Sequence, residues 1–264
     1  MESQLIDGWY HAKSFGDLTV WCKALLRNRH LHALALLVIL FSVHFGTVWA
    51  QGIDDARRCF QETKADLRIH YCTRAIHSRR LSDTDLAITF NNRGIACWGK
   101  REYDRAIRDY HQSIRLNPNF VEAFNQRGFT YWEKKEYERA IQDFNQAIRI
   151  EPNYADALNY RGLTKFDSGQ FLAAVPDFDK AAQLVPSKSY SVIWRYLAQS
   201  RAGQNGRDTL ASSASRLELK QWPGPVVSMY RGKITRRALL EAALDSDPAK
   251  QRERQCEAYF YVGE

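Results

Sequence analysis

Small and apolar residues recur along the middle of this chain with a constant step of 34 positions. The sequence FNNRG begins at Phe90, FNQRG at Phe124 and LNYRG at Leu158. A fixed step of this length predicts stacked units of one kind, because each unit needs its neighbours to bury its apolar face. Three further columns keep the same step: alanine at Ala106, Ala140 and Ala174, an aromatic residue at Tyr110, Phe144 and Phe178, and proline at Pro118, Pro152 and Pro186.

The columns of small residues predict that each unit consists of two antiparallel helices. Glycine and alanine lack the bulk that would hold two crossing backbones apart, so they mark the positions where the helices touch. Proline closes each unit because it cannot continue the second helix, and it turns the chain toward the next unit. The regular units are therefore expected at 87–120, 121–154 and 155–188.

This pattern resembles the tetratricopeptide repeat (TPR) consensus, in which glycine stands at the eighth position, alanine at the twentieth and proline at the thirty-second. The resemblance implies an all-α fold, a right-handed superhelical solenoid of antiparallel helix pairs. Outside the regular units we expect a degenerate helical pair at 51–86 and a degenerate repeat at 189–219. A C-terminal helical extension that ends in an incomplete repeat is expected at 220–264.

The period of 34 fails in the C-terminal extension. Trp222-Pro-Gly-Pro225 predicts a rigid turn, with short helices at 226–231 and 235–244 and a last helix from Pro248. Because the chain ends before a second helix could follow, the aromatic residues near the end are expected to lack the partner that normally covers them. These residues are Tyr259, Phe260 and Tyr261.

Residues 31–50, LHALALLVILFSVHFGTVWA, form the longest apolar run of the chain. Basic residues precede this run, and Val48 and Ala50 fit cleavage by a signal peptidase before Gln51. Two interpretations remain open: residues 1–50 are a leader with a cleaved signal peptide, or the apolar run is an uncleaved membrane anchor. Both place the repeats outside the cytoplasm, in a periplasmic or secreted protein or on an inner-membrane anchor with the repeats facing the periplasm.

Charge and candidate chemistry argue for binding to protein rather than to nucleic acid, and against catalysis. The formal net charge is +8, but Lys and Arg are scattered beside Asp and Glu, without a basic run interleaved with aromatic residues. All seven histidines lie at or before His111, and no Ser/His/Asp, Cys/His or paired-carboxylate constellation stands out. We expect no metal and no cofactor. Cys59 and Cys72 can close a disulfide or remain two buried thiols.

The TPR resemblance implies that the first helix of each repeat lines a concave groove. Its positions five, nine and twelve would supply a ladder of amides, which can hold an extended peptide backbone, and a row of aromatic anchors. The alternative is that the amides only bridge neighbouring first helices and the aromatic residues pack between repeats. The expected groove residues are Asn91, Ile95, Trp98, Asn125, Phe129, Trp132, Asn159, Leu163 and Phe166. Glu122, Glu133, Asp156 and Asp167 make the later half of this groove acidic, which favours a partner segment with Lys or Arg.

A second ladder, at positions seven and twenty-three, is expected to hold each repeat together. Antiparallel pairing of the two helices brings these positions close, so that each Arg can make a bidentate pair with an Asp of its own repeat. An anion-binding row of arginines is the alternative. The expected pairs are Arg93 with Asp109, Arg127 with Asp143, and Arg161 with Asp177.

The C-terminal segment carries a closer resemblance. Gln221-Trp222, Val226, Tyr230-x-Gly232-x-Ile234, Leu239, Asp245 and the run CEAYFYVG are similar to the tail of bacterial envelope TPR lipoproteins of the NlpI type. The resemblance implies a non-catalytic periplasmic adaptor that dimerises and brings cell-wall hydrolases and a processing protease together. The chain departs from it in having no lipidation box before Gln51 and in ending inside the last repeat, which leaves membrane attachment and a homodimer open. Rival hypotheses are a membrane-anchored structural subunit of an envelope assembly and a binder of an anionic polymer.

Overall fold

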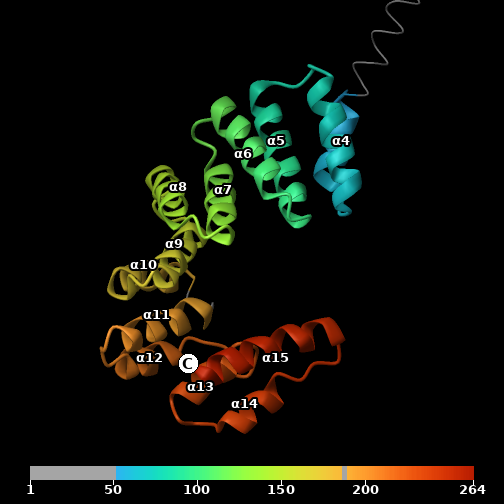
Figure 1. Ribbon diagram of the computed structural model, residues 1–264. Helices are drawn as coiled ribbons and strands as arrows, with labels where there is room; N and C mark the ends of the chain where they lie inside the picture. The colour runs from blue at the N-terminus through green and yellow to red at the C-terminus, as the bar shows by residue number, and fades with distance from the viewer. Residues whose placement is uncertain (1–51, 186–188) are drawn as a thin grey trace, which may run out of the picture.

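A computed structural model describes residues 52–185 and 189–264. Every regular element in these two ranges is a helix, and they contain no strand. Figure 1 shows the helices following an arc, with α4 near one end and α11 to α15 at the other. The prediction of an all-helical solenoid is confirmed. The apolar run 31–50 lies outside the described residues, and none of the helices within them is long and apolar enough to cross a membrane.

The arc is built from helix pairs in chain order. Residues 52–61 are helical and precede α4 (Ala65–His77). Three regular pairs follow, and in Figure 1 their first helices α7 and α9 lie on the inner side of the arc, with α8 and α10 outside. The regular pairs are α5 (Asp83–Gly99) with α6 (Tyr103–Leu116), α7 (Val121–Glu133) with α8 (Tyr137–Ile150), and α9 (Ala155–Asp167) with α10 (Phe171–Leu184).

A degenerate pair and three further helices complete the chain. In the degenerate pair, α11 (Ser189–Arg201) precedes α12 (Arg207–Ala214), which ends five residues before the expected boundary at Leu219. The last three helices are α13 (Gly224–Tyr230), α14 (Arg236–Ala242) and α15 (Pro248–Gly263).

Direct contact between a glycine and an aromatic ring sets the distance between the two helices of each regular pair. A Cβ atom on Gly94 would lie 2.6 Å from Cε1 of Tyr110, and one on Gly162 would lie 2.7 Å from Cε1 of Phe178. These rings are fully buried. Since real Cβ atoms do not approach other carbon atoms so closely, glycine is required where the ring of the second helix meets the first helix.

The turn inside each repeat places one residue in the left-handed region of the backbone. These residues keep the step of 34, and two of the four are not glycine. The next backbone N–H closes the turn on the preceding helix, as from Glu136 to the carbonyl of Tyr131 at 2.9 Å. The residues and their φ angles are Arg101 (61°), Lys135 (60°), Gly169 (79°) and Gly203 (74°).

The C-terminal helices form the largest apolar cluster of the described residues. Side chains from α11 to α15 meet in it, with Tyr261 only 3% exposed. The expectation that the last aromatic residues lie uncovered is therefore wrong for Tyr261, because α11 and α13 supply the missing cover. The Tyr230 hydroxyl donates to the carbonyl of Tyr261 at 2.9 Å, and the ring of Trp194 lies 6.4 Å from that of Tyr261. Tyr259 and Phe260 are exposed.

Candidate binding groove on the inner face

The aromatic side chains of the inner helices form contacts from one repeat to the next. Trp98 of α5 meets Phe129 of α7 with ring centres 5.3 Å apart, and Phe129 meets Tyr160 of α9 at 4.8 Å. Further along, Phe166 of α9 meets Trp194 of α11 at 5.2 Å. All five side chains are half-buried. Each ring therefore packs against its neighbour and still presents part of its surface to solvent. The same residues can hold adjacent repeats together and contact a ligand.

The row of aromatic side chains ends at a pocket of about 450 Å³ between α7, α9, α11 and α15. Its apolar lining includes Trp132, Leu163, Trp194 and Phe260. Of these, Trp132 and Leu163 belong to the groove residues expected from the sequence, whereas Trp194 and Phe260 do not. The pocket exists because α15 returns to the inner end of the arc, next to α11.

Two carboxylates line the pocket, and neutral donors hold both. The indole N–H of Trp132 donates to Asp167 Oδ2 at 2.7 Å. The hydroxyl of Tyr190 and the indole N–H of Trp222 each donate to Glu257 Oε2 at 3.0 Å. Burial raises the pKa of Asp167, and the hydrogen bond from Trp132 lowers it by less. Within the described ranges, neither carboxylate pairs with a Lys or Arg side chain.

The amide ladder lies deeper than a peptide-facing row would. Asn91 and Asn125 are only 5% and 4% exposed, and their Oδ1 atoms are buried without a hydrogen-bond partner among the described residues. The third member differs, because Asn159 Oδ1 accepts from Ser191 Oγ at 2.8 Å. Ser191 stands in the next repeat, so this amide bridges neighbouring first helices. At the positions equivalent to Ser191, the repeats that follow Asn91 and Asn125 have Ala123 and Ala157. These alanine side chains have no hydrogen-bond donor.

The remaining expected groove residues lie near the start of the aromatic row. Ile95 is half-buried and packs against the cluster around Cys97 and Tyr110. The indole nitrogen of Trp98 is buried and has no hydrogen-bond partner in the described part of the chain. Neither residue lines the pocket at the other end of the row.

The arginine and aspartate ladder consists of paired, mostly buried side chains. Arg93 donates to Asp109 through Nε at 2.8 Å and Nη2 at 2.7 Å. Arg127 makes the same two contacts with Asp143, at 2.8 and 2.7 Å. Because both donors of each guanidinium edge are held by a carboxylate of the same repeat, this geometry supports a structural role rather than an open anion-binding row.

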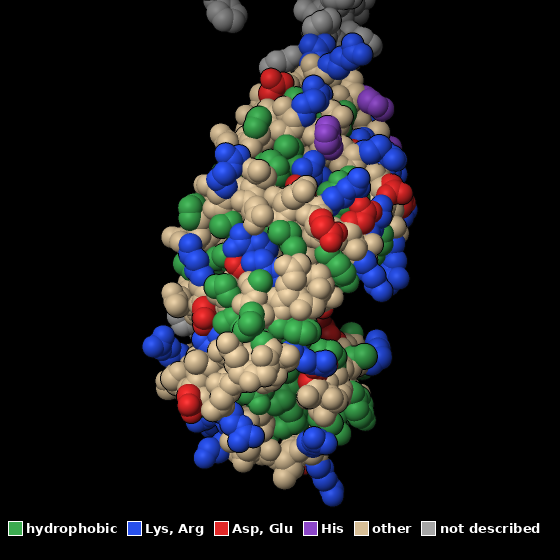
Figure 2. Space-filling view, turned by 60° about the vertical axis from the view of Figure 1, so that its left-hand side comes forward, with side chains coloured by type: hydrophobic (Ala, Val, Ile, Leu, Met, Phe, Trp, Pro, Cys, Tyr) green, Lys and Arg blue, Asp and Glu red, His purple; other side chains and the backbone are tan. Residues whose placement is uncertain are grey.

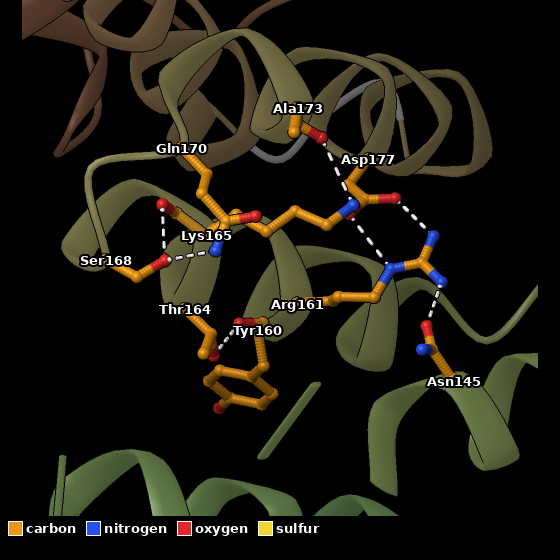
Figure 3. A network of polar contacts seen from close by, with 9 residues as sticks. All are labelled: Asn145, Tyr160, Arg161, Thr164, Lys165, Ser168, Gln170, Ala173 and Asp177. Atoms are coloured by element: carbon orange, nitrogen blue, oxygen red, sulfur yellow. Dashed lines mark hydrogen bonds and ion pairs between the residues drawn. The ribbon is translucent and has the colours of Figure 1, made fainter. Parts of the chain in front are cut away.

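The third pair is the centre of a wider network, shown in Figure 3. Arg161 Nε donates to Asp177 Oδ2 at 2.9 Å, and its Nη2 donates to the other carboxylate oxygen. Its Nη1 reaches Asn145 Oδ1 of the preceding repeat at 2.6 Å. Lys165 also donates to Asp177 Oδ2, at 2.7 Å. The network thus ties α8, α9 and α10 together.

Arg195 is a fourth member of this column that the sequence analysis missed. It follows Arg161 by the same 34 positions, but the matching aspartate is replaced by Ala211. Arg195 is buried and donates instead to Asp179 Oδ1 at 2.6 Å, to the carbonyl of Thr209 at 2.8 Å and to Ser213 Oγ at 2.9 Å. The column spacing was the signal that could have identified it.

The described cysteines differ in their surroundings. Cys59 and Cys72 are joined by a disulfide with Cα atoms 4.8 Å apart, which links residues 52–61 to α4. Cys97 is a buried thiol whose pKa is raised by desolvation to about 11. Cys256 is exposed and lies on the wall of the pocket.

Charged side chains show no single-sign patch on the side of the arc that carries α8, α10 and α12. Figure 2 turns this side forward and shows Lys and Arg interspersed with Asp, Glu and apolar side chains. Within 52–185 and 189–264, no group of three or more His, Cys, Asp or Glu residues is placed to hold a metal ion.

The tetratricopeptide repeat family model matches residues 87–120 and 121–154. The chain contains TPR repeats. Its third regular pair, α9 and α10, repeats the same glycine-to-ring contact outside the matched ranges. No curated protein sequence matches the chain.

Two solved structures of MamA show the same fold. The crystal structure of MamA protein is 18% identical, covers 71% of this chain and 96% of its own, and has a TM-score of 0.55. MamA 41-end from Desulfovibrio magneticus RS-1 is 17% identical, with coverages of 64% and 90% and a TM-score of 0.54. The first TPR of Spaghetti (RPAP3), bound to an HSP90 peptide, is 20% identical, with coverages of 47% and 97% and a TM-score of 0.45.

Proposed function

We propose that this protein is a non-catalytic adaptor that binds a segment of a partner protein at the inner face of its TPR array. The observation that carries the proposal is the pocket at the end of the aromatic row. TPR repeats are protein interaction modules, and this pocket offers an interaction site of defined shape and chemistry.

The pocket has the volume, the apolar lining and the fixed aromatic side chains that favour binding of a protein segment. Its volume of about 450 Å³ falls within the range typical of ligand sites, which runs from about 300 to 1,000 Å³. Transfer of one large apolar side chain from water into such a site is worth about 1.5–3 kcal/mol. Trp132 and Trp194 are held by contacts with neighbouring groups, so they present rigid anchors at little cost in conformational entropy.

The buried amides enter this proposal in a supporting role. Since Asn91 and Asn125 lie beneath the surface, we propose that the aromatic row makes the first contact with a ligand. The amides then space the inner helices, as Asn159 does through Ser191.

We further propose that the adaptor works in the bacterial cell envelope, where it would scaffold cell-wall enzymes or a protease. The disulfide between Cys59 and Cys72 supports this location, because disulfides persist in oxidising compartments such as the periplasm. The rival hypothesis of a membrane-anchored structural subunit depends on residues 31–50, which lie outside the described residues. Intact mass measurement of the mature protein tests it: loss of residues 1–50 would contradict anchoring.

Quantitative affinity purification from envelope extract tests the adaptor function. Phe260→Ser removes an exposed side chain of the pocket, and Leu172→Ser removes an exposed side chain of α10 that does not line it. We expect Phe260→Ser to lose specific partners and Leu172→Ser to retain them. Equal recovery of the same partners by both variants and the wild type would contradict binding at the pocket.

A further inference from the structure

The two carboxylates of the pocket come from different parts of the fold. Asp167 is the last residue of α9, in the third regular repeat, and Glu257 belongs to α15, ninety residues further along the chain. Both line the same apolar pocket. Both carboxylates accept hydrogen bonds from neutral donors. In the described part of the chain, no Lys or Arg side chain pairs with either one.

Carboxylates in this setting carry an unbalanced charge. At Asp167, partial removal from water penalises the ionised form, and the hydrogen bond from Trp132 compensates only part of that penalty. The buried Asp177, 3% exposed, binds both Arg161 and Lys165. Asp167 is exposed and Glu257 is half-buried, so both remain accessible to a ligand. The fold therefore supplies cations where it needs to balance a buried carboxylate, and it supplies none at the pocket.

Cations on or next to the helices that line the pocket are engaged elsewhere. Arg254, one turn before Glu257 on α15, pairs with Asp245 at 2.7 Å. Lys165 on α9 pairs with Asp177, Lys134 after α7 pairs with Asp104 and Glu136, and Arg201 at the end of α11 pairs with Glu264. A cationic group brought by a ligand would meet no competing lysine or arginine among these.

We infer that the pocket recognises a protein segment that presents a large apolar side chain next to Lys or Arg. The apolar side chain packs between Trp132, Leu163, Trp194 and Phe260, while the cation pairs with Asp167 and Glu257. The same negative charge repels an acidic segment or an anionic polymer. This inference rests on the proposed adaptor function and specifies the chemistry of its partner.

Cys256 supplies a reporter of occupancy at this pocket. It is an exposed thiol on the pocket wall, whereas Cys97 is buried and Cys59 is bonded to Cys72. A Cys22→Ser background removes the remaining cysteine, which lies outside the described residues. In this background, the rate of maleimide labelling under native conditions reports access to Cys256.

Three short peptides with a Gly and Ser background, acetylated and amidated at their ends, serve as probes and differ in four residues. The first contains two Phe and two Lys, the second replaces Lys with Glu, and the third replaces Phe with Ser. We expect only the Phe and Lys peptide to slow labelling of Cys256. The inference is overturned if the Glu peptide protects as well as the Lys peptide, or if the Lys peptide gives no protection.

Isosteric variants of the carboxylates test the pairing itself. Asp167→Asn and Glu257→Gln retain an oxygen acceptor for the indole and hydroxyl donors while removing both charges. We expect the double variant to bind the Phe and Lys peptide about tenfold more weakly, with little preference for Lys over Glu. The matched control is Glu138→Gln with Glu218→Gln, which removes two exposed charges outside the pocket and should leave affinity unchanged.

The outcome can separate this inference from the adaptor function. If Phe260→Ser abolishes partner recovery and the double carboxylate variant does not, the pocket binds a partner but not through a cation, and the inference is wrong. If both variants retain all partners, the adaptor function at this pocket fails as well.

Discussion

At the scale of single residues, the spacing of each helix pair depends on one missing methyl group. Gly94→Ala places a Cβ atom 2.6 Å from Cε1 of Tyr110, whose ring is fully buried. Overpacking of this kind costs about 1–3 kcal/mol, against a gain of up to about 1 kcal/mol from the better helix propensity of alanine. We expect Gly94→Ala to lower the urea midpoint with an unchanged m-value.

Gly99 provides the control on the same helix. A Cβ atom there meets no other atom within 4 Å. Gly99→Ala should therefore leave the free energy of unfolding unchanged or raise it by up to about 1 kcal/mol. Equal destabilisation by the two substitutions would show that backbone flexibility, and not contact with the ring, explains the glycine column.

A second residue-scale prediction concerns the unpaired amide of Asn125. Ala157 occupies the position that Ser191 holds beside Asn159, and it is completely buried. Ala157→Ser should place a hydroxyl donor against Asn125 Oδ1 and raise the free energy of unfolding by about 1 kcal/mol. Denaturation of Ala157→Ser, with and without Asn125→Ala, measures the coupling between the two side chains. A stabilisation that persists without the amide would contradict this explanation.

At the scale of helices and turns, the sequence predicted the helix pairs because their contacts are local. The glycine, the ring and the Arg and Asp pair of one repeat lie within 34 residues, so a repeated column reports a repeated contact. The left-handed turn residues were not predicted. Arg101 and Lys135 carry no local signal for that conformation, and only Gly169 and Gly203 in the same column indicate it.

This turn gives a prediction with opposite signs at two equivalent sites. Lys135 has φ of 60°, where a side chain costs about 1–2 kcal/mol, and Gly169 adopts the same region without that cost. Part of the stability gained by glycine at this position is lost, because glycine also raises the conformational entropy of the unfolded chain. We expect Lys135→Gly to raise the free energy of unfolding and Gly169→Lys to lower it, each by about 0.5–1 kcal/mol, with thermal unfolding as the measurement. Destabilisation by both would indicate that other contacts of Lys135 outweigh its backbone strain.

At the scale of the whole molecule, the pocket could not be derived from the period. Its first half, Trp132 and Leu163, stands in columns that repeat, and the sequence pointed to both. Most of the rest of its lining comes from α11, in the degenerate repeat, and from α15. A segment without a repeat pattern returns α15 to the inner end of the arc. The position of a helix after an irregular connection depends on long-range packing, which column spacing does not encode.

The same long-range packing makes the last helix part of the C-terminal core. Tyr261 is 3% exposed and contacts Trp194 and Tyr230 from two other helices. Replacement of a buried aromatic side chain by alanine costs about 3–5 kcal/mol, because it removes apolar burial and leaves a cavity. In a solenoid each unit depends mainly on its neighbours, so this loss should stay near the end where it occurs.

We therefore expect Tyr261→Ala to increase amide hydrogen exchange in α11 to α15, while the disulfide-linked residues near Cys59 and Cys72 keep their protection. Tyr259→Ala is the matched control, since Tyr259 lies on the same helix but is 65% exposed. It should change the free energy of unfolding by no more than about 0.5 kcal/mol. If Tyr261→Ala instead lowers protection evenly from α4 to α15, the array unfolds as one cooperative unit, and the pocket would share the stability of the whole superhelix rather than that of its C-terminal end.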